Sequence, residues 1–192
     1  MIKTLEPYIE TWTGKKFYFL KPEPDMIDIR DIAHSLAMQC RFTGHVDTFM
    51  SVAEHAVAVS LICNKENELQ GLLHDASEAY LSDIASPIKQ QFPQYYEMEH
   101  RLMEAIAIKF GFPYPLSDDV KDADATQLKT EAKFLLPSGG ADWAPLFPTQ
   151  GRKGKVPMCL APAHAEQLFL NSYEQITGET VSSTKESLVL VA

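Results

Sequence analysis

Apolar residues recur at helical spacing along most of this 192-residue chain, and this periodicity limits the possible folds more than any other feature. Ile29, Ile32 and Leu36, for example, fall on one face of the first periodic segment. The same pattern predicts helices over residues 28–40, 49–63, 67–80, 95–110, 117–136 and 162–177. Such a succession of helices predicts an all-α, single-domain helical bundle over residues 1–178.

Some segments fall outside the helical pattern. Gly14 is followed by an aromatic run, so residues 11–20 favour a short N-terminal β arm. Residues 137–158 are rich in proline and glycine and predict a long loop, of a kind that is usually functional or mobile. The C-terminal tail, residues 179–192, is rich in serine and threonine before an apolar end, and we assign no structure to it.

Composition and charge narrow the classes of partner. Apolar residues make up 45% of the chain, enough for a packed core, and the formal net charge is −9. A protein that binds a nucleic-acid duplex usually presents a basic face, so we expect no nucleic-acid polymer as a partner. No apolar run approaches the roughly 18 residues that a membrane-spanning helix needs, and the N-terminus lacks the apolar core of a signal peptide. We therefore expect a cytoplasmic protein with no membrane partner.

One group of residues has the composition of a metal site. His74 and Asp75 are adjacent near the end of an expected helix, where both can turn toward one ion. This pair alone is common by chance, but His55 lies on the preceding expected helix and Asp124 on a later one. Two imidazoles and two carboxylates from three helices suit a first-row transition metal and leave coordination positions for water and substrate.

The sequence around these residues resembles a known family. The stretches SVAEHAV, LLHDASEAYLSDIASPIK and KDADATQLKTE are similar to those of HD-domain nucleotidohydrolases, in particular the bacterial 5′-deoxynucleotidase-like branch and the small phage dATP triphosphohydrolases. The resemblance runs from about residue 17 to residue 173. It implies an HD-domain fold and a catalytic divalent metal, which is zinc, cobalt or manganese. The ligands that it implies are His55, His74, Asp75 and Asp124.

The resemblance also implies a catalytic role for Glu78 and for Arg41. Glu78 lies one helical turn after His74, so the two share a face, and a carboxylate there can activate or orient the attacking water. Arg41 matches an arginine that contacts the substrate phosphate, and its planar guanidinium can hold an oxyanion through two hydrogen bonds. Glu131 follows Asp124 by two helical turns, so we expect it on the same face.

Further positions match substrate contacts of the family. Phe42 stands where many relatives carry an aromatic residue, often tryptophan, that leaves no room for a 2′-hydroxyl. Asp83 falls where relatives have an acid near the leaving group or sugar, and Lys89 falls where a lysine can reach the outer phosphates. The basic residues of segment 152–155 could also take part in triphosphate recognition.

The resulting hypothesis is a dNTP triphosphohydrolase that acts on dATP. Metal-activated water attacks the α-phosphorus and releases the deoxynucleoside and tripolyphosphate. A 5′-nucleotidase that cleaves dNMPs to deoxynucleoside and phosphate is the main alternative. An HD-type cyclic-nucleotide phosphodiesterase, a non-catalytic nucleotide-sensing HD module and a structural protein without a metal are others. The partner that we expect is a small deoxynucleotide, and relatives suggest a homo-oligomer.

Overall fold

A short hairpin precedes the helices in the computed structural model, which describes residues 6–182. Strand β1 (Ile9–Glu10) pairs antiparallel with β2 (Lys16–Phe17), so that Ile9 lies opposite Phe17. Gly14 has a φ of 82° in the connecting turn, a conformation that glycine adopts without steric cost. The β arm predicted from the sequence is confirmed, although its first strand begins before residue 11.

Helices dominate the rest of the described chain, as the apolar periodicity predicts. They are α1 (Ile29–Met38), α2 (Val52–Ser60), α3 (Glu68–Leu72), α4 (Glu78–Leu81), α5 (Ser86–Lys89), α6 (Pro93–Phe110), α7 (Asp118–Leu135) and α8 (Pro162–Thr177). Single turns of 3-10 helix are η1 (Pro24–Met26), η3 (Lys65–Asn67) and η4 (Ala144–Leu146), whereas η2 (Arg41–Gly44) is a turn with a left-handed backbone at its two inner residues. The protein is therefore mostly helical, with one two-stranded sheet among the described residues.

The ends of the long helices follow from local chemistry. The Ser117 hydroxyl accepts a hydrogen bond from the Val120 amide and caps the start of α7. Gly111 and Gly178 follow α6 and α8 in the left-handed conformation, with φ values of 73° and 75°. Pro162 occupies the first turn of α8, where its missing amide proton costs no helical hydrogen bond.

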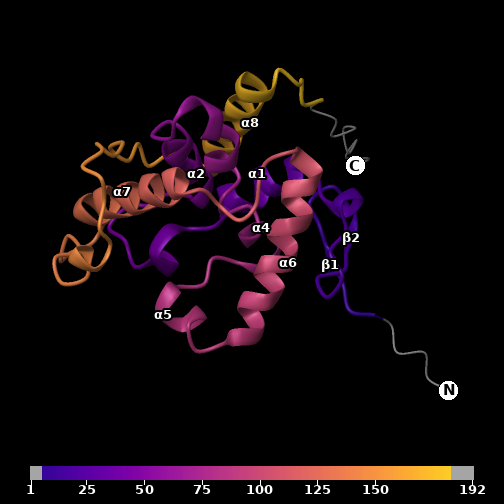
Figure 1. Cartoon of the computed structure of the whole chain (residues 1–192), viewed down its shortest axis with the longest axis horizontal. Helices are drawn as coiled ribbons and strands as arrows, with labels where there is room; N and C mark the ends of the chain where they lie inside the picture. Colours follow the sequence, from indigo (N-terminus) through magenta and orange to yellow (C-terminus); the bar gives the residue numbers. More distant parts are fainter. Residues whose placement is uncertain (1–5, 183–192) are drawn as a thin grey trace, which may run out of the picture.

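Helix α2 lies at the centre of the packing. All nine of its residues are buried, and it packs against α1, α3, α7 and α8. Figure 1 shows α2, α7 and α8 in the upper part of the view, α5 below them, and α6 running from the level of α7 down toward α5. Because α2 is buried on every side, a polar residue in it must find partners inside the protein. This condition applies to Glu54 and His55.

The sequence predicts one continuous helix over residues 67–80, and this prediction is wrong. Helix α3 ends at Leu72, residues 73–77 form tight turns, and α4 begins at Glu78. In the turns, the Ala76 amide donates to the Leu73 carbonyl and the Glu78 amide to the Asp75 carbonyl, which is a spacing of three rather than four residues. The segment contains no proline and its one glycine lies before the break, so the composition does not signal it.

Residues 137–158 form the predicted long connection, with η4 as its helical turn. Its end is held by the buried carboxylate of Glu54, which accepts hydrogen bonds from the amides of Met158, Cys159 and Leu160 at 2.6, 3.1 and 2.8 Å. Of the tail, residues 179–182 are described, and Val181 packs against the core; residues 183–192 lie outside the described part. No helix within residues 6–182 is long and apolar enough to cross a membrane.

Candidate metal centre

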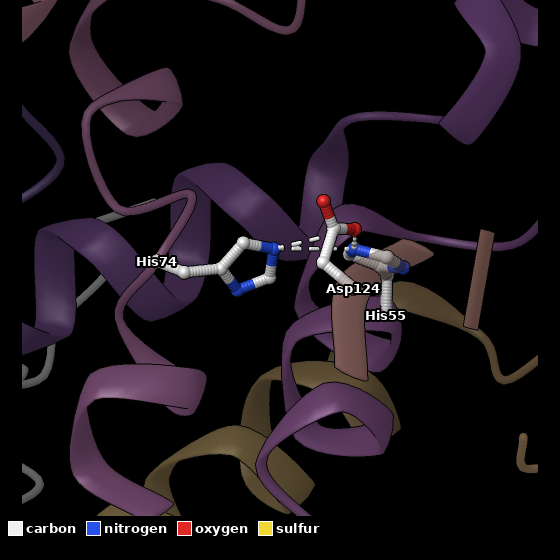
Figure 2. A group of neighbouring side chains, drawn as sticks. All are labelled: His55, His74 and Asp124. Atoms are coloured by element: carbon white, nitrogen blue, oxygen red, sulfur yellow. Dashed lines mark hydrogen bonds and ion pairs between the residues drawn. The ribbon is translucent and has the colours of Figure 1, made fainter. Parts of the chain in front are cut away.

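Four side chains from different parts of the chain converge on one point. His55 comes from α2, His74 and Asp75 from the turn after α3, and Asp124 from α7. One possible ligand atom each of His55, His74 and Asp124 lies within 4.8 Å of the others. Figure 2 shows the two imidazole rings directing a nitrogen toward the Asp124 carboxylate. The structure thus brings together all the residues for which the sequence suggests metal ligation.

The distances within the cluster are those of groups that can share one ion. His55 Nε2 lies 3.3 Å from His74 Nε2 and 3.1 Å from Asp124 Oδ1. Asp75 Oδ2 is 3.1 Å from His74 Nε2 and 3.6 Å from His55 Nε2. Two imidazole nitrogens and two carboxylate oxygens form a donor set that suits zinc, cobalt or manganese. These residues therefore fit a divalent transition metal.

The break between α3 and α4 explains how adjacent residues reach one point. In a regular α-helix, consecutive side chains point about 100° apart around the axis. Leu73 leaves the helical conformation (φ −105°, ψ 10°), and the turn after it carries His74 and Asp75 to the same side. The unpredicted interruption is therefore a local feature that the cluster requires.

The outer nitrogen of each imidazole is held by a separate acceptor. His55 Nδ1 lies 2.8 Å from Glu131 Oε1, and His74 Nδ1 lies 2.8 Å from the Gly71 carbonyl oxygen. An acceptor at Nδ1 selects the tautomer that leaves Nε2 unprotonated and fixes the ring orientation. Both Nε2 atoms are thereby prepared to bind a metal.

The charges of the cluster favour a cation at its centre. Burial acts to lower the pKa of His74, but the carboxylates of Asp75 and Asp124 outweigh it and raise that pKa well above its usual value. Burial acts to raise the pKa of Asp124, but the two imidazoles lower it well below its usual value. The site thus stabilises positive charge between its carboxylates. A divalent cation can supply this positive charge while both imidazoles stay neutral. The side chains of Asp75 and Asp124 are 22% and 41% exposed, so the cluster is accessible from solvent.

Arg41 lies beside the cluster at the start of a left-handed turn. The next three residues, Phe42, Thr43 and Gly44, have φ values of 53°, 55° and 78°. This conformation is unfavourable for a phenylalanine and for a β-branched threonine, and such strain is typical of functional segments. The Arg41 guanidinium carbon lies 5.5 Å from the centre of the Phe42 ring. The turn thus positions Arg41 and Phe42, the two side chains that the sequence assigns to phosphate and sugar binding.

Carboxylates surround the Arg41 guanidinium. Its Nε donates to Glu131 Oε2 at 3.1 Å, and its Nη1 lies 4.0 Å from Asp83 Oδ2. Burial opposes the charge of Arg41, but Glu131, Asp75 and Asp83 outweigh it and raise the pKa of the guanidinium above its usual value. Arg41 is therefore a permanent positive charge between the metal cluster and Asp83.

Glu78 and Lys89 form an ion pair at the edge of the site. Lys89 Nζ lies 3.0 Å from Glu78 Oε1 and 2.7 Å from Glu99 Oε1. Glu78 Oε2 is buried and has no hydrogen-bond partner within the described residues. Burial, together with Asp75 and Asp83, raises the pKa of Glu78 well above its usual value. Lys89, which the sequence suggests for outer phosphates, is here the partner of two glutamates.

Two residues of this region escaped the sequence analysis. The Gln39 amide donates to the Glu78 carbonyl and its oxygen accepts from the Asp83 amide, so it ties α4 to the following segment. Glu99 on α6 is the second partner of Lys89. A lone glutamine and one glutamate among several on a helix carry no signal of these contacts. Glu131, by contrast, lies where its spacing from Asp124 predicts.

A cavity of about 620 Å³ adjoins the site on the side of the N-terminal hairpin. Its lining includes Gln39, Glu78 and Ser82. Trp12 and His34 also line it, and their rings stack with centres 3.8 Å apart. The volume lies in the range of about 300–1,000 Å³ that is typical of small-molecule sites.

Comparison with known proteins identifies relatives of the chain. It is 40% identical over 172 residues to the uncharacterized protein YfdR of Escherichia coli (strain K12). The aligned region covers 88% of this chain and 96% of YfdR. It is also 35% identical over 137 residues to an uncharacterized protein of Rhodobacter capsulatus. That alignment covers 64% of this chain and 70% of the other protein. No protein-family model matches the chain.

Proposed function

The chain belongs to the protein family of Escherichia coli YfdR, and for this member we propose a metal-dependent phosphohydrolase of the HD type that acts on deoxynucleotides. The convergence of His55, His74, Asp75 and Asp124 carries the proposal. Arg41, a buried cation beside this cluster, adds the means to bind a phosphate.

A divalent zinc, cobalt or manganese ion would be held by His55, His74, Asp75 and Asp124. When bound, it would supply Lewis acidity, which lowers the pKa of a coordinated water and polarises a phosphoryl oxygen. The hydrogen bonds at both imidazole Nδ1 atoms support this assignment, since metal-binding histidines almost always donate their other ring proton.

Arg41 and Glu78 then have separate tasks in the hydrolysis. Arg41 binds the phosphate and neutralises charge that develops on it, because its guanidinium stays protonated at any physiological pH. Glu78 accepts a proton from the attacking water. Its raised pKa makes it a stronger base than an exposed glutamate. Glu78 can then deliver this proton to the 5′-oxygen as its bond to the α-phosphorus breaks, so that the deoxynucleoside leaves as an alcohol. Lys89 holds Glu78 in place through the 3.0 Å contact.

The nucleoside part of the substrate would lie toward Phe42, Asp83 and the adjoining cavity. Phe42 gives an apolar surface for the deoxyribose, and Asp83 an acceptor for a sugar hydroxyl. The cavity lined by Gln39 and Glu78 has room for a base.

The first substrate that we propose is a dNTP, in particular dATP, on the basis of the family resemblance. The arrangement of cations favours a dNMP as a second candidate. Lys89 is engaged by Glu78 and Glu99, and Arg152 by acids of α7. A triphosphate needs cations beside its distal phosphates. Lys89 and Arg152 can contribute their charges only after they leave these acidic partners.

Product analysis tests the proposal. The protein, supplemented with cobalt, manganese or zinc, is incubated with dATP, dAMP, ATP and the other dNTPs, and the nucleoside, phosphate and tripolyphosphate are quantified. We expect deoxyadenosine and tripolyphosphate from dATP; deoxyadenosine and phosphate from dAMP would establish the second candidate. Cleavage of ATP as fast as dATP would exclude Phe42 as the sugar gate. No turnover with any metal or substrate would overturn the hydrolase and favour a nucleotide sensor.

A further inference from the structure

Glu131 is the most completely engaged carboxylate of the site, although it contacts the centre of the cluster only through other residues. It lies on α7 and its side chain is 0% exposed. Oε1 accepts from His55 Nδ1 at 2.8 Å and from Gln127 Nε2 at 2.9 Å, and Oε2 accepts from Arg41 Nε at 3.1 Å. One buried carboxylate thus joins a metal ligand to the proposed phosphate ligand.

The two oxygens of Glu131 accept hydrogen bonds from different residues, and this makes the contacts depend on each other. A buried carboxylate is tolerated only when donors satisfy it, and here the donors belong to the functional site itself. Any rotation of Glu131 that improves one contact displaces the other, because both oxygens belong to one planar group. Gln127, whose amide also bonds the backbone of Lys155 in both directions, restricts such rotation.

We propose that Glu131 is a positioning residue that orients His55 for the metal and Arg41 for the phosphate at the same time. The inference rests on the proposed function in assigning His55 and Arg41 to these ligands. It adds that the two binding events depend on one carboxylate outside the cluster. Loss of that carboxylate weakens both the binding of the metal and the binding of the phosphate.

Glu131→Gln is the informative substitution because it keeps the volume and removes one acceptor. An amide has one oxygen, which can accept from His55 or from Arg41, while its NH₂ group faces the other donor. Removing a partner of this kind typically costs about 10–100-fold in metal affinity. Glu131→Asp is a second variant that keeps the charge but is too short to maintain both contacts. Asp28→Asn is the matched control: the Asp28 side chain is 13% exposed and pairs with Lys15 and Arg30, outside the site.

The experiment measures binding rather than turnover. Folded protein, verified by circular dichroism, is titrated with Co²⁺ while the visible absorption spectrum is recorded, and inorganic phosphate is then titrated calorimetrically into the cobalt-loaded protein. We expect both glutamate variants to bind Co²⁺ about 10–100-fold more weakly, with a changed spectrum, and to bind phosphate more weakly, while Asp28→Asn matches the wild type.

Two results would overturn the inference, and they are distinguishable. If the wild type binds Co²⁺ and a folded Glu131→Gln or Glu131→Asp protein binds Co²⁺ and phosphate equally well, Glu131 is not a positioning residue. If the wild type binds no Co²⁺, the metal centre itself is refuted and the inference falls with it.

Discussion

Metal binding should stabilise the folded protein in a way that depends on Asp124. Its Oδ1 lies 3.1 Å from His55 Nε2 and 3.8 Å from His74 Nε2, so this carboxylate oxygen is placed to share a metal ion with both imidazoles. Asp124→Asn replaces this charged metal ligand with a neutral amide of nearly the same shape. We expect the variant to fold and to lose most of its stabilisation by Zn²⁺ or Co²⁺.

The size of the effect follows from ligand linkage. A metal at 100 times its Kd stabilises the folded state by about 2.7 kcal/mol. If the substitution weakens binding by about 100-fold, which is the upper range for loss of an indirect partner, the same concentration gives only about 0.4 kcal/mol. For a chain of this length, about 1 kcal/mol corresponds to about 2–4 °C in Tm. The wild type should therefore gain about 5–9 °C more than Asp124→Asn from the same metal.

The assay is differential scanning calorimetry of chelator-treated protein with and without added metal. Asp118→Asn is the matched control, because Asp118 lies on the same helix and its side chain is 94% exposed. The control should keep the full metal-dependent shift in Tm. An equal shift in wild type and Asp124→Asn would refute the placement of the metal between these residues.

Three substitutions elsewhere test the structural reasoning by urea denaturation. In Gly71→Ala the new Cβ lies 2.7 Å from Cys63 Sγ and 3.1 Å from Ser60 Cα. Helix α3 must therefore move away from α2, at a cost of about 1–3 kcal/mol in the free energy of unfolding. An unchanged urea midpoint would contradict this. Glu54→Ala leaves three backbone amides without their acceptor and should cost about 2–4 kcal/mol, and a loss within about 0.5 kcal/mol would exclude it as an anchor. Arg30 and Lys15 lower the pKa of Asp28 in the folded protein. Its ion pairs therefore stabilise the protein fully above the unfolded pKa of 3.8, and this stabilisation is lost as the pH falls through the lower, folded pKa. Asp28→Asn should therefore cost about 1 kcal/mol at pH 7 and progressively less below pH 3.8, whereas a pH-independent cost would refute the ion pairs.

The sequence predicts the position of the site better than its connections. His55 and Asp124 lie on helices whose periodicity is clear, and Glu131 follows from helical spacing alone. Each of these residues owes its direction to a helix face, which is a local property. The break after Leu72 was missed because it contains neither proline nor a glycine at the turn, and tertiary packing outweighs the helical preference of the segment.

Contacts between distant charged residues could not be predicted. Lys89 reaches Glu78 and Glu99 because α5 packs against α6 and places this side chain beside the start of α4. Nothing in the sequence distinguishes this lysine from a phosphate ligand. The left-handed turn at Phe42 and Thr43 is similarly invisible, since neither residue favours that conformation. Pairings of this kind depend on the assembled fold rather than on local pattern.

The most direct test of the metal-dependent mechanism is the turnover of metal-saturated Asp75→Ala. The variant and the wild type are assayed for deoxynucleoside release from dATP and dAMP in excess cobalt, with Asp118→Asn as the control. We predict that the wild type and the control are active and that Asp75→Ala is inactive, because Asp75 Oδ2 lies 3.1 Å from His74 Nε2 within the donor set. Full activity of metal-replete Asp75→Ala would contradict the proposed centre.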